Sequence, residues 1–481
     1  MLALAWSLVG PLAVGTAQAE PAPTCEAHLT PSLGGSCGDH KLELKLTNRY
    51  RVEFWDAFAG SDDSFHGLRT RVSAKYSYRD GVTLFGELQD ARIWGLDSDT
   101  SGAGSLYRKW GGSRHMKKAQ TTEMRQFWAE IRPIEGLSLR AGRQDIKLGT
   151  QAIYKEAAWK YLKIARASQR LVGTVGWTNV ERSNDAVSGA YDTEDYHFYG
   201  FAGKPTTGVF ESENAYETQD DIVYGGVSVT AKRGTWFDNT EVRPFFLGYK
   251  DDRAERSGGQ PDGKVEIYTL GFSAIGVYPV GPGNFDLLLW GAGQAGNFND
   301  DDHLAYALIG EAGYQFTDVW SSPWFRAGVN FASGDSNAGG GDHNTFFNML
   351  PTNHLYYGFA DQLAFQNLVD LIAQVKLKPH PRVGLNVMFH KFWMANSDDA
   401  QYFGTGAFNR ENFGYGGNKA GANDFGEELD LVLDVKVHDH VSVQAGYARL
   451  WGGEIIRNQI NIGERTKRDL DFGYLQVVFS Y

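Results

Sequence analysis

Regular alternation of apolar and charged residues is the feature that most limits what this chain can fold into. In residues 42–54 the side chains change character at almost every step. The apolar positions are Leu42, Leu44, Leu46, Tyr50, Val52 and Phe54, and the polar positions are Glu43, Lys45, Thr47, Arg49, Arg51 and Glu53. A period of two predicts a β-strand with one apolar and one polar face. Repeated charge on the polar face fits a water-filled lumen better than a packed core, so we expect a membrane barrel.

The end of the chain, residues 470–481 (LDFGYLQVVFSY), carries the same pattern. One face would hold Gly473, Leu475, Val477, Phe479 and Tyr481. The last strand of a soluble sheet often frays, whereas a membrane barrel must pair its last strand with its first so that no backbone edge meets lipid. We therefore predict that residues 470–481 close the barrel against residues 42–54.

Alternating segments of about ten residues recur along the chain, joined in turn by short and long connections. The clearest hairpin joins 68–78 to 82–91 through Arg79-Asp80-Gly81. The predicted strands are 42–54, 68–78, 82–91, 122–132, 137–145, 170–180, 196–204, 221–232, 240–250, 264–278, 284–297, 303–317, 323–334, 366–378, 383–393, 427–437, 441–451 and 470–481. Residues 184–190 are assigned to a turn region, and 156–167 to a short helix. The prediction is an all-β, transmembrane antiparallel β-barrel of about 18 strands with short periplasmic turns and long extracellular loops.

The N-terminal residues predict export. Residues 1–19 are an apolar run ending in Ala17-Gln18-Ala19, which fits a signal peptidase site. We expect a signal peptide at 1–19, a periplasmic segment at 20–41 and a single outer-membrane barrel domain at 42–481. After Ala19 no apolar stretch approaches the roughly 20 residues that a spanning helix needs.

Two places could hold a covalent or metal link. Cys25 and Cys37 are close enough in sequence to form a local disulfide in an oxidising periplasm, and a metal site that also uses His28 and His40 is the alternative. The loop 334–361 is rich in carboxylates and amides, so calcium binding is an alternative there to a surface loop or a folded-in constriction.

Several function classes are disfavoured by the sequence. A net charge of −12 argues against nucleic acid as a partner. The chain has no nucleophile elbow, P-loop or zinc-binding HExxH motif, so we expect no enzyme, no cofactor and no catalytic metal.

Inward basic residues are the candidate pore-lining groups. Alternation turns Arg49 and Arg51 toward the lumen, and the antiparallel neighbour strand places Arg69 and Arg71 at similar heights. Lys75 and Arg140 extend this basic ladder, which would attract anions in a narrow lumen. Inward acidic positions on late strands are Asp370, Glu428, Asp430 and Asp434. The alternative is that these charges form ordinary lumen salt bridges and select nothing.

Motifs in a fixed order give the chain a family resemblance. They are Gly142-Arg143-Gln144, RLVGTVGWTNV at 170–180, Asn348-Met349-Leu350-Pro351-Thr352-Asn353-His354 with Tyr356, Tyr357, Gly358 and Asp361, His390-Lys391-Phe392-Trp393, and Glu427-Glu428-Leu429-Asp430-Leu431. From about residue 42 to the end, the chain resembles the alginate-export family of outer-membrane proteins. The resemblance implies a monomeric eighteen-stranded barrel with an arginine-lined pore for an anionic uronate polysaccharide, and it adds Arg143 and His390 to the candidate pore residues. Because Arg143 shares the parity of Leu139, a bulge near Gly142 would be needed to turn it inward.

One departure from the family bears on the expected function. In the alginate exporter a long periplasmic loop before the last hairpin helps to plug the pore, whereas here only His438-Asp439-His440 stand in its place. We expect a passive outer-membrane channel for an anionic polysaccharide or oligosaccharide, with outer-membrane lipid and periplasmic export proteins as partners. A general or carbohydrate-uptake porin is the first alternative. A secreted all-β polysaccharide-binding or cleaving protein is the second, and the apolar face of residues 42–54 argues against it.

Overall fold

The computed structural model describes residues 25–28, 33–58, 61–96, 107, 118–212, 214–253, 264–337, 340–402, 422–460 and 467–481. The predicted signal peptide at 1–19 lies outside the described residues.

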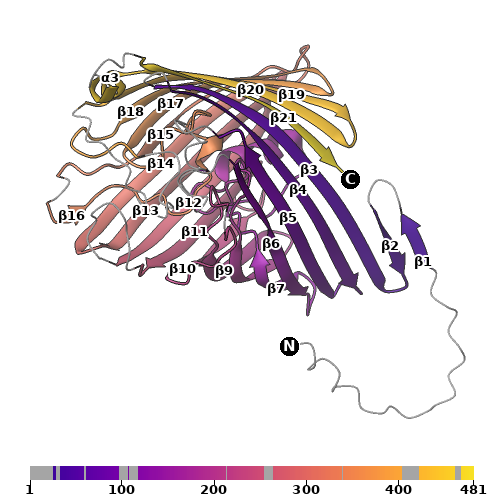
Figure 1. Cartoon of the computed structure of the whole chain (residues 1–481). Helices are drawn as coiled ribbons and strands as arrows, with labels where there is room; N and C mark the ends of the chain where they lie inside the picture. The colour runs from indigo at the N-terminus through magenta and orange to yellow at the C-terminus, as the bar shows by residue number, and fades with distance from the viewer. Residues whose placement is uncertain are drawn as a thin grey trace, which may run out of the picture.

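Eighteen strands of the described chain form a closed antiparallel barrel in which each strand pairs with the next (Figure 1). The strands are β3 (His40–Ala57), β4 (Ser61–Tyr78), β5 (Val82–Trp94), β6 (Lys118–Ile131), β7 (Leu137–Gln144), β8 (Asn184–Asp192), β9 (Tyr196–Pro205), β10 (Ile222–Ala231), β11 (Thr240–Asp251), β12 (Val265–Val280), β13 (Gly283–Phe298), β14 (Asp301–Phe316), β15 (Trp324–Ala332), β17 (Leu368–His380), β18 (Val383–Met394), β19 (Asp424–His438), β20 (Val441–Gly452) and β21 (Asp469–Ser480). The predicted architecture and strand count are confirmed.

Closure occurs where the alternation predicted it. β21 pairs with β3 from Asp471 opposite Asp56 to Ser480 opposite Thr47. The amide of Tyr481 then donates to the carbonyl of Leu46, and the Leu46 amide donates back. The first and last strands therefore leave no unpaired edge along this seam.

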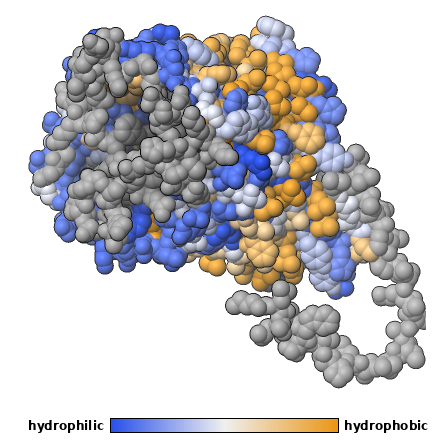
Figure 2. Space-filling view, viewed as in Figure 1, coloured by the Kyte–Doolittle hydropathy of each residue, from blue (hydrophilic) through white to orange (hydrophobic). Residues whose placement is uncertain are grey.

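The two faces of the strands differ as a membrane barrel requires. On β3, Leu42 and Phe54 are exposed on the outer wall, whereas Arg49, Arg51 and Glu53 are buried in the interior. Apolar side chains cover much of the outer wall in Figure 2. Lipid in place of water explains why large apolar side chains can stay outside and charged ones inside.

A small disulfide-bonded hairpin extends the sheet beside β3. It consists of β1 (Cys25–His28) and β2 (Leu33–Cys37), and β2 pairs with the start of β3 (Figure 1). Cys37 is disulfide-bonded, and the chain's only other cysteine, Cys25, lies opposite it in register. The predicted local disulfide is confirmed.

Two strand assignments near the middle of the chain were wrong. Residues 170–180 are not a strand but part of a segment inside the lumen, and residues 184–190, predicted as a turn region, belong to β8. The apolar side chains of residues 170–180 pack against other protein segments inside the lumen rather than against lipid. The weak signal of β8 comes from its small residues, such as Gly189 and Ala190. The strand count was right because the two errors cancel.

Short helices lie off the barrel wall. α2 (Ala157–Tyr161) and the π-helix η2 (Leu162–Ala167) form the predicted helix of 156–167, and η3 (Asn353–Leu355) and α3 (Glu454–Ile460) lie in later connections. The two-residue strand β16 (Asp342–His343) pairs in parallel with the start of β14. None of the helices in the described parts of the chain is long and apolar enough to cross a bilayer.

Candidate functional site

The connection between β7 and β8, residues 145–183, crosses the barrel lumen, as its contacts on two walls establish (Figure 1). At its helical part, Lys163 contacts Glu241 on β11 and Arg166 contacts Glu311 on β14. Near its end, residues 176–181 contact β3, β4 and β6. We call residues 145–183 the inserted segment.

Arginines of β3 meet main-chain oxygens of the inserted segment. The Arg49 guanidinium donates to the carbonyls of Gly176 at 3.1 Å and Thr178 at 2.9 Å. Arg51 donates to the carbonyl of Trp177 at 2.8 Å. Sequence alternation placed these arginines inward correctly, but in this structure they hold a protein segment rather than border open water.

A single carboxylate of the inserted segment gathers three wall arginines. Glu181 lies 2.5 Å from Arg69 Nη1, 3.0 Å from Arg71 Nη2 and 2.8 Å from Arg125 Nη2. Burial by itself raises the pKa of Glu181, but the positive charges of Arg71, Arg69 and Arg125 hold it well below its ordinary value. The Glu181 side chain is therefore a buried carboxylate that stays ionised.

An aromatic stack joins residues 176–181 of the inserted segment to residues 344–367, which also lie in the lumen. The Arg51 guanidinium lies 3.7 Å from the centroid of the Trp177 ring, and the His354 ring stacks on Trp177 at 3.8 Å. His354 in turn bonds to Asp361 at 2.7 Å. Cation–π contact and stacking thus fix the turn that carries Glu181.

At the helical end the charges are reversed. Lys163 Nζ lies 2.5 Å and 2.6 Å from the two carboxylate oxygens of Glu241. Glu311 accepts from Arg166 and Arg170 of the inserted segment and from Arg326 of the wall. Burial lowers the pKa of Lys163 to about 8, against the opposing effect of Glu241.

Residues 344–367 form the second lumen segment and pair with the first. Val172 and Leu350 form a parallel β-bridge, and the amide of Gly173 donates to the carbonyl of Leu350. The amide of Ala360 donates to Glu428 on β19 at 2.9 Å. Part of the loop 334–361 is therefore folded into the lumen, which agrees with the constriction hypothesis for that loop.

His390, a candidate from the family resemblance, faces the lumen among buried carboxylates. Its Nδ1 lies 2.9 Å from Asp370 and its Nε2 lies 3.7 Å from Asp430. Register places Glu428 directly opposite it. The inward acidic positions predicted on the late strands thus gather around this histidine, apart from Asp434, which accepts from Gln444.

Two further predicted pore residues, Lys75 and Arg140, contact other residues of the barrel wall. Lys75 is half exposed and lies 3.8 Å from Glu43. Arg140 bonds to Glu130 and lies 3.9 Å from the centroid of Trp128.

Arg143 keeps the outward parity of its strand. It pairs with Asp185 on β8 at 2.8 Å, and the register between β6 and β7 shows no bulge that would turn it inward. In this structure it therefore lies on the face of Leu139 and Val187 rather than facing the lumen.

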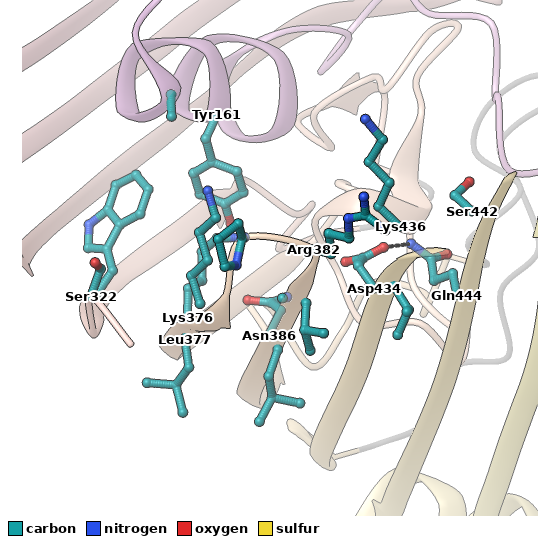
Figure 3. A pocket seen from close by; sticks show the side chains of 18 of the residues that line it. Tyr161, Ser322, Lys376, Leu377, Arg382, Asn386, Asp434, Lys436, Ser442 and Gln444 are labelled. Atoms are coloured by element: carbon teal, nitrogen blue, oxygen red, sulfur yellow. Dashed lines mark hydrogen bonds between the residues drawn. The ribbon is translucent and has the colours of Figure 1, made fainter. Parts of the chain in front are cut away.

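A cavity of about 510 Å³ opens at the periplasmic end, below the inserted segment. Its polar lining comes from the ends of the late strands and from Tyr161, and Figure 3 shows these side chains together. The cations in it are Lys376, Lys378, Arg382 and Lys436. Lys376 lies 3.9 Å from the Tyr161 ring centroid. Sequence reasoning did not single out these residues, because each stands next to a turn in an otherwise ordinary strand.

Two residues central to the site were also missed. Arg125 lies at a β-bulge between β5 and β6, so counting alternate positions does not place it reliably. Glu181 follows a stretch predicted as a strand, and nothing in its sequence surroundings distinguishes it from a loop carboxylate.

No group of three or more His, Cys, Asp or Glu side chains with suitable geometry occurs within the described ranges. Carboxylates of the loop 334–361 have other partners: Asp335 accepts from the Asn337 amide, and Asp361 bonds to His354.

Comparison with known proteins places this geometry among outer-membrane channels. A family model described as alginate export matches residues 40–466. No curated protein sequence matches the chain significantly.

Solved structures with a similar fold include proteins of two bacteria. OccAB2 of Acinetobacter baumannii matches with a TM-score of 0.60 at 11% identity, over 92% of this chain and 98% of that one. OpdK of Pseudomonas aeruginosa matches with a TM-score of 0.56 at 10% identity, over 91% and 98%. OccK2 (OpdF) of P. aeruginosa, solved in complex with glucuronate, matches with a TM-score of 0.55 at 9% identity, over 91% and 97%. At these identities the likeness shows the fold alone.

Proposed function

Because the chain belongs to the alginate export family of outer-membrane channels, we propose that it passes an anionic, alginate-like polysaccharide or oligosaccharide along a basic lumen. Passage would be passive and would need no covalent step. A uronate chain offers one carboxylate per sugar together with many hydroxyl and ring oxygens, and arginine guanidinium groups bind both kinds of acceptor.

The observation that carries this proposal is the arginine wall of β3 and β4. Arg49, Arg51, Arg69 and Arg71 all project into the lumen, and in this structure their partners there include carbonyl and carboxylate oxygens. A polyanion could replace these acceptors one by one. Many weak, similar sites favour movement along a channel, because no single site holds the chain.

The cavity at the periplasmic end also supports passage of an anionic chain, because its charged lining is mostly basic. Four cations line it and only Asp434 opposes them with a negative charge. Asn386 and Gln444 add amide groups, which can bond to sugar hydroxyls. An anionic chain would meet this cavity before it reached the arginine wall.

The test is single-channel conductance and ion selectivity of the refolded protein in planar bilayers. The variant changes Arg49, Arg51, Arg69 and Arg71 to Ser, and glucuronate, the ligand of the OccK2 complex, serves with its oligomers as the probe. We expect anion preference to fall by roughly tenfold in the variant, because the basic wall concentrates anions. Arg92→Ser is the matched control, since Arg92 lies on the neighbouring strand β5, is exposed, and its side chain pairs with Asp90. Wild-type conductance without anion preference would contradict the proposal.

A carbohydrate-uptake porin is the second candidate. It is favoured by the tight turn between β19, which ends at His438, and β20, which begins at Val441, because so short a turn cannot plug the periplasmic opening. This candidate predicts that neutral oligosaccharides pass as readily as oligouronates. The first candidate predicts a preference for the charged sugars.

A further inference from the structure

We propose that Arg69, Arg71 and Arg125 form a binding subsite for the carboxylate of a sugar acid, and that Glu181 fills this subsite as an internal substitute for the ligand. Binding of the sugar acid and withdrawal of the turn 175–181 would then be one event. The inference rests on the proposed function, since it names how that channel is closed and what opens it.

Two of the three arginines, Arg71 and Arg125, have side-chain partners other than Glu181, whereas the other partner of Arg69 is the carbonyl of Thr178 in the turn. Arg71 Nε donates to Gln89 at 2.6 Å. Arg125 donates to Glu87 and to Asp145, each at 2.6 Å. The part of the cradle formed by Arg71 and Arg125 therefore persists when its occupant leaves, which is what a ligand site requires and an ordinary salt bridge does not.

Glu181, which occupies the subsite, belongs to a part of the chain that is not a strand of the barrel wall. Glu181 comes from the inserted segment, whereas Arg69 lies on β4 and Arg125 on β6. The neighbouring turn offers carbonyls of residues 176–178 to Arg49, Arg51 and Arg69. A carboxylate next to a row of neutral oxygens is also what one uronate unit of a polysaccharide presents to such a wall.

The backbone of the turn shows that it is held in place at a conformational cost. Val175 has φ of 55° and Glu181 has φ of 70°. Left-handed backbone is unfavourable for residues with a Cβ, and for a β-branched valine most of all. The contacts with the arginines contribute to holding this conformation, beside the bonds of Asn179 to the carbonyls of Leu68 and Arg92 and of Gln89 to the carbonyl of Val180. A ligand that takes over the arginine contacts therefore removes part of what holds the turn.

The direct test is the isosteric variant Glu181→Gln in the full-length refolded channel. Loss of the internal carboxylate should lower the glucuronate concentration needed for half-saturation by about tenfold, because less of the protein is held in the closed form. The fraction of time the channel spends open should rise in parallel. Glu130→Gln is the matched control, because Glu130 is also buried on the wall and takes two arginine partners outside the cradle. Equal affinity and equal opening in wild type and Glu181→Gln would overturn the inference.

Chemical rescue separates binding from loss of structure. In Glu181→Ala, acetate or glucuronate should raise the unfolding temperature, whereas glucose should not. In the wild type, where Glu181 competes for the subsite, the rise with acetate or glucuronate should be smaller. A merely structural Glu181 predicts no carboxylate-specific rescue. Absence of rescue in folded Glu181→Ala would therefore count against the cradle.

A tether gives a third measurement that does not remove the carboxylate. A Cβ added at Gly67 would lie 3.3 Å from Asn179 Cγ, so cysteines at both positions are placed to link the turn to β4. The oxidised Gly67→Cys, Asn179→Cys channel should neither bind nor pass glucuronate, and reductant should restore both. Wild type with reductant controls for the native disulfide, and passage through the tethered channel would overturn the inference.

The proposed function and this inference fail in different ways. Passage of glucuronate through wild type with no effect of any variant would leave the function standing and reject the internal substitute. No passage but carboxylate-specific rescue would reject the function and support the cradle. No passage and no rescue would reject both.

Discussion

The two ends of the inserted segment attach to the barrel with opposite charges. At the helical end the segment supplies cations, Lys163 and Arg166, and the wall supplies carboxylates, Glu241 and Glu311. At the turn 175–181 the segment supplies oxygens and a carboxylate, and the wall supplies arginines. One element thus meets carboxylates of the wall on one side of the lumen and arginines of the wall on the other.

This difference decides which end a passing anion can release. An anion can replace the turn, because the partners of the turn on the wall are arginines, but it cannot replace the helical end, whose partners Glu241 and Glu311 are carboxylates. The helical end therefore acts as the fixed anchor and the turn as the part that moves. Buried ion pairs are weak sources of stability but strongly penalise the loss of one partner, so each end is held as long as both partners remain.

The largest effect should come from removing the anchor. Glu311→Gln leaves the guanidinium groups of Arg166, Arg170 and Arg326 without their shared carboxylate. Loss of one partner of a buried ionic cluster costs about 3–5 kcal/mol. We expect the free energy of unfolding in denaturant to fall by that amount, with new protease cleavage within 145–183. Unchanged stability and cleavage would mean that the helical end is not the anchor.

A smaller effect is expected at the stack beside the turn. Trp177→Ala removes the ring between Arg51 and His354. A desolvated cation–π contact contributes about 2 kcal/mol, so the turn should detach more often and open-channel events should become more frequent. Trp320→Ala is the control, because Trp320 is 79% exposed. Equal opening frequencies in the two variants would remove the stack from the closing mechanism.

Replacing the ion pair of the anchor by apolar residues should have little effect. Lys163 and Glu241 are both buried, and exchange of such a pair for apolar side chains of similar volume is often neutral or stabilising. The double variant Lys163→Met, Glu241→Leu should therefore keep its unfolding free energy and stay closed. Frequent opening of this double variant would show that the anchor needs charge as well as packing.

The smallest effect concerns pH. The pKa of Glu181 is held well below its ordinary value, so its stabilisation of the closed form is complete above the unfolded-state pKa of about 4.3 and is lost only as the pH falls through the lowered value. Opening frequency should stay constant from about pH 8 to about pH 5. A change within that range that persists in Glu181→Gln would have another titrating group as its source, and one abolished by Glu181→Gln would contradict the lowered pKa.

The sequence predicted the strands of the barrel wall better than the segments that fill the lumen. Alternation placed Arg49, Arg51, Arg69 and Arg71 inward and identified the closing strand, because the direction of each side chain follows from the local backbone. The sequence pattern was misleading at residues 170–180, which were predicted as a strand. Residues such as Leu171 and Val172 are apolar because they pack inside the lumen, and an apolar run looks alike whether lipid or protein covers it.

By itself, the sequence determined a closed barrel with an apolar outside and arginines on one inner wall. Tertiary structure alone decided that those arginines meet Thr178 and Glu181, which lie more than a hundred residues away along the chain. The reason is physical: the period of a strand is a local property of the backbone, whereas the partner of an inward charge depends on which distant segment fills the lumen.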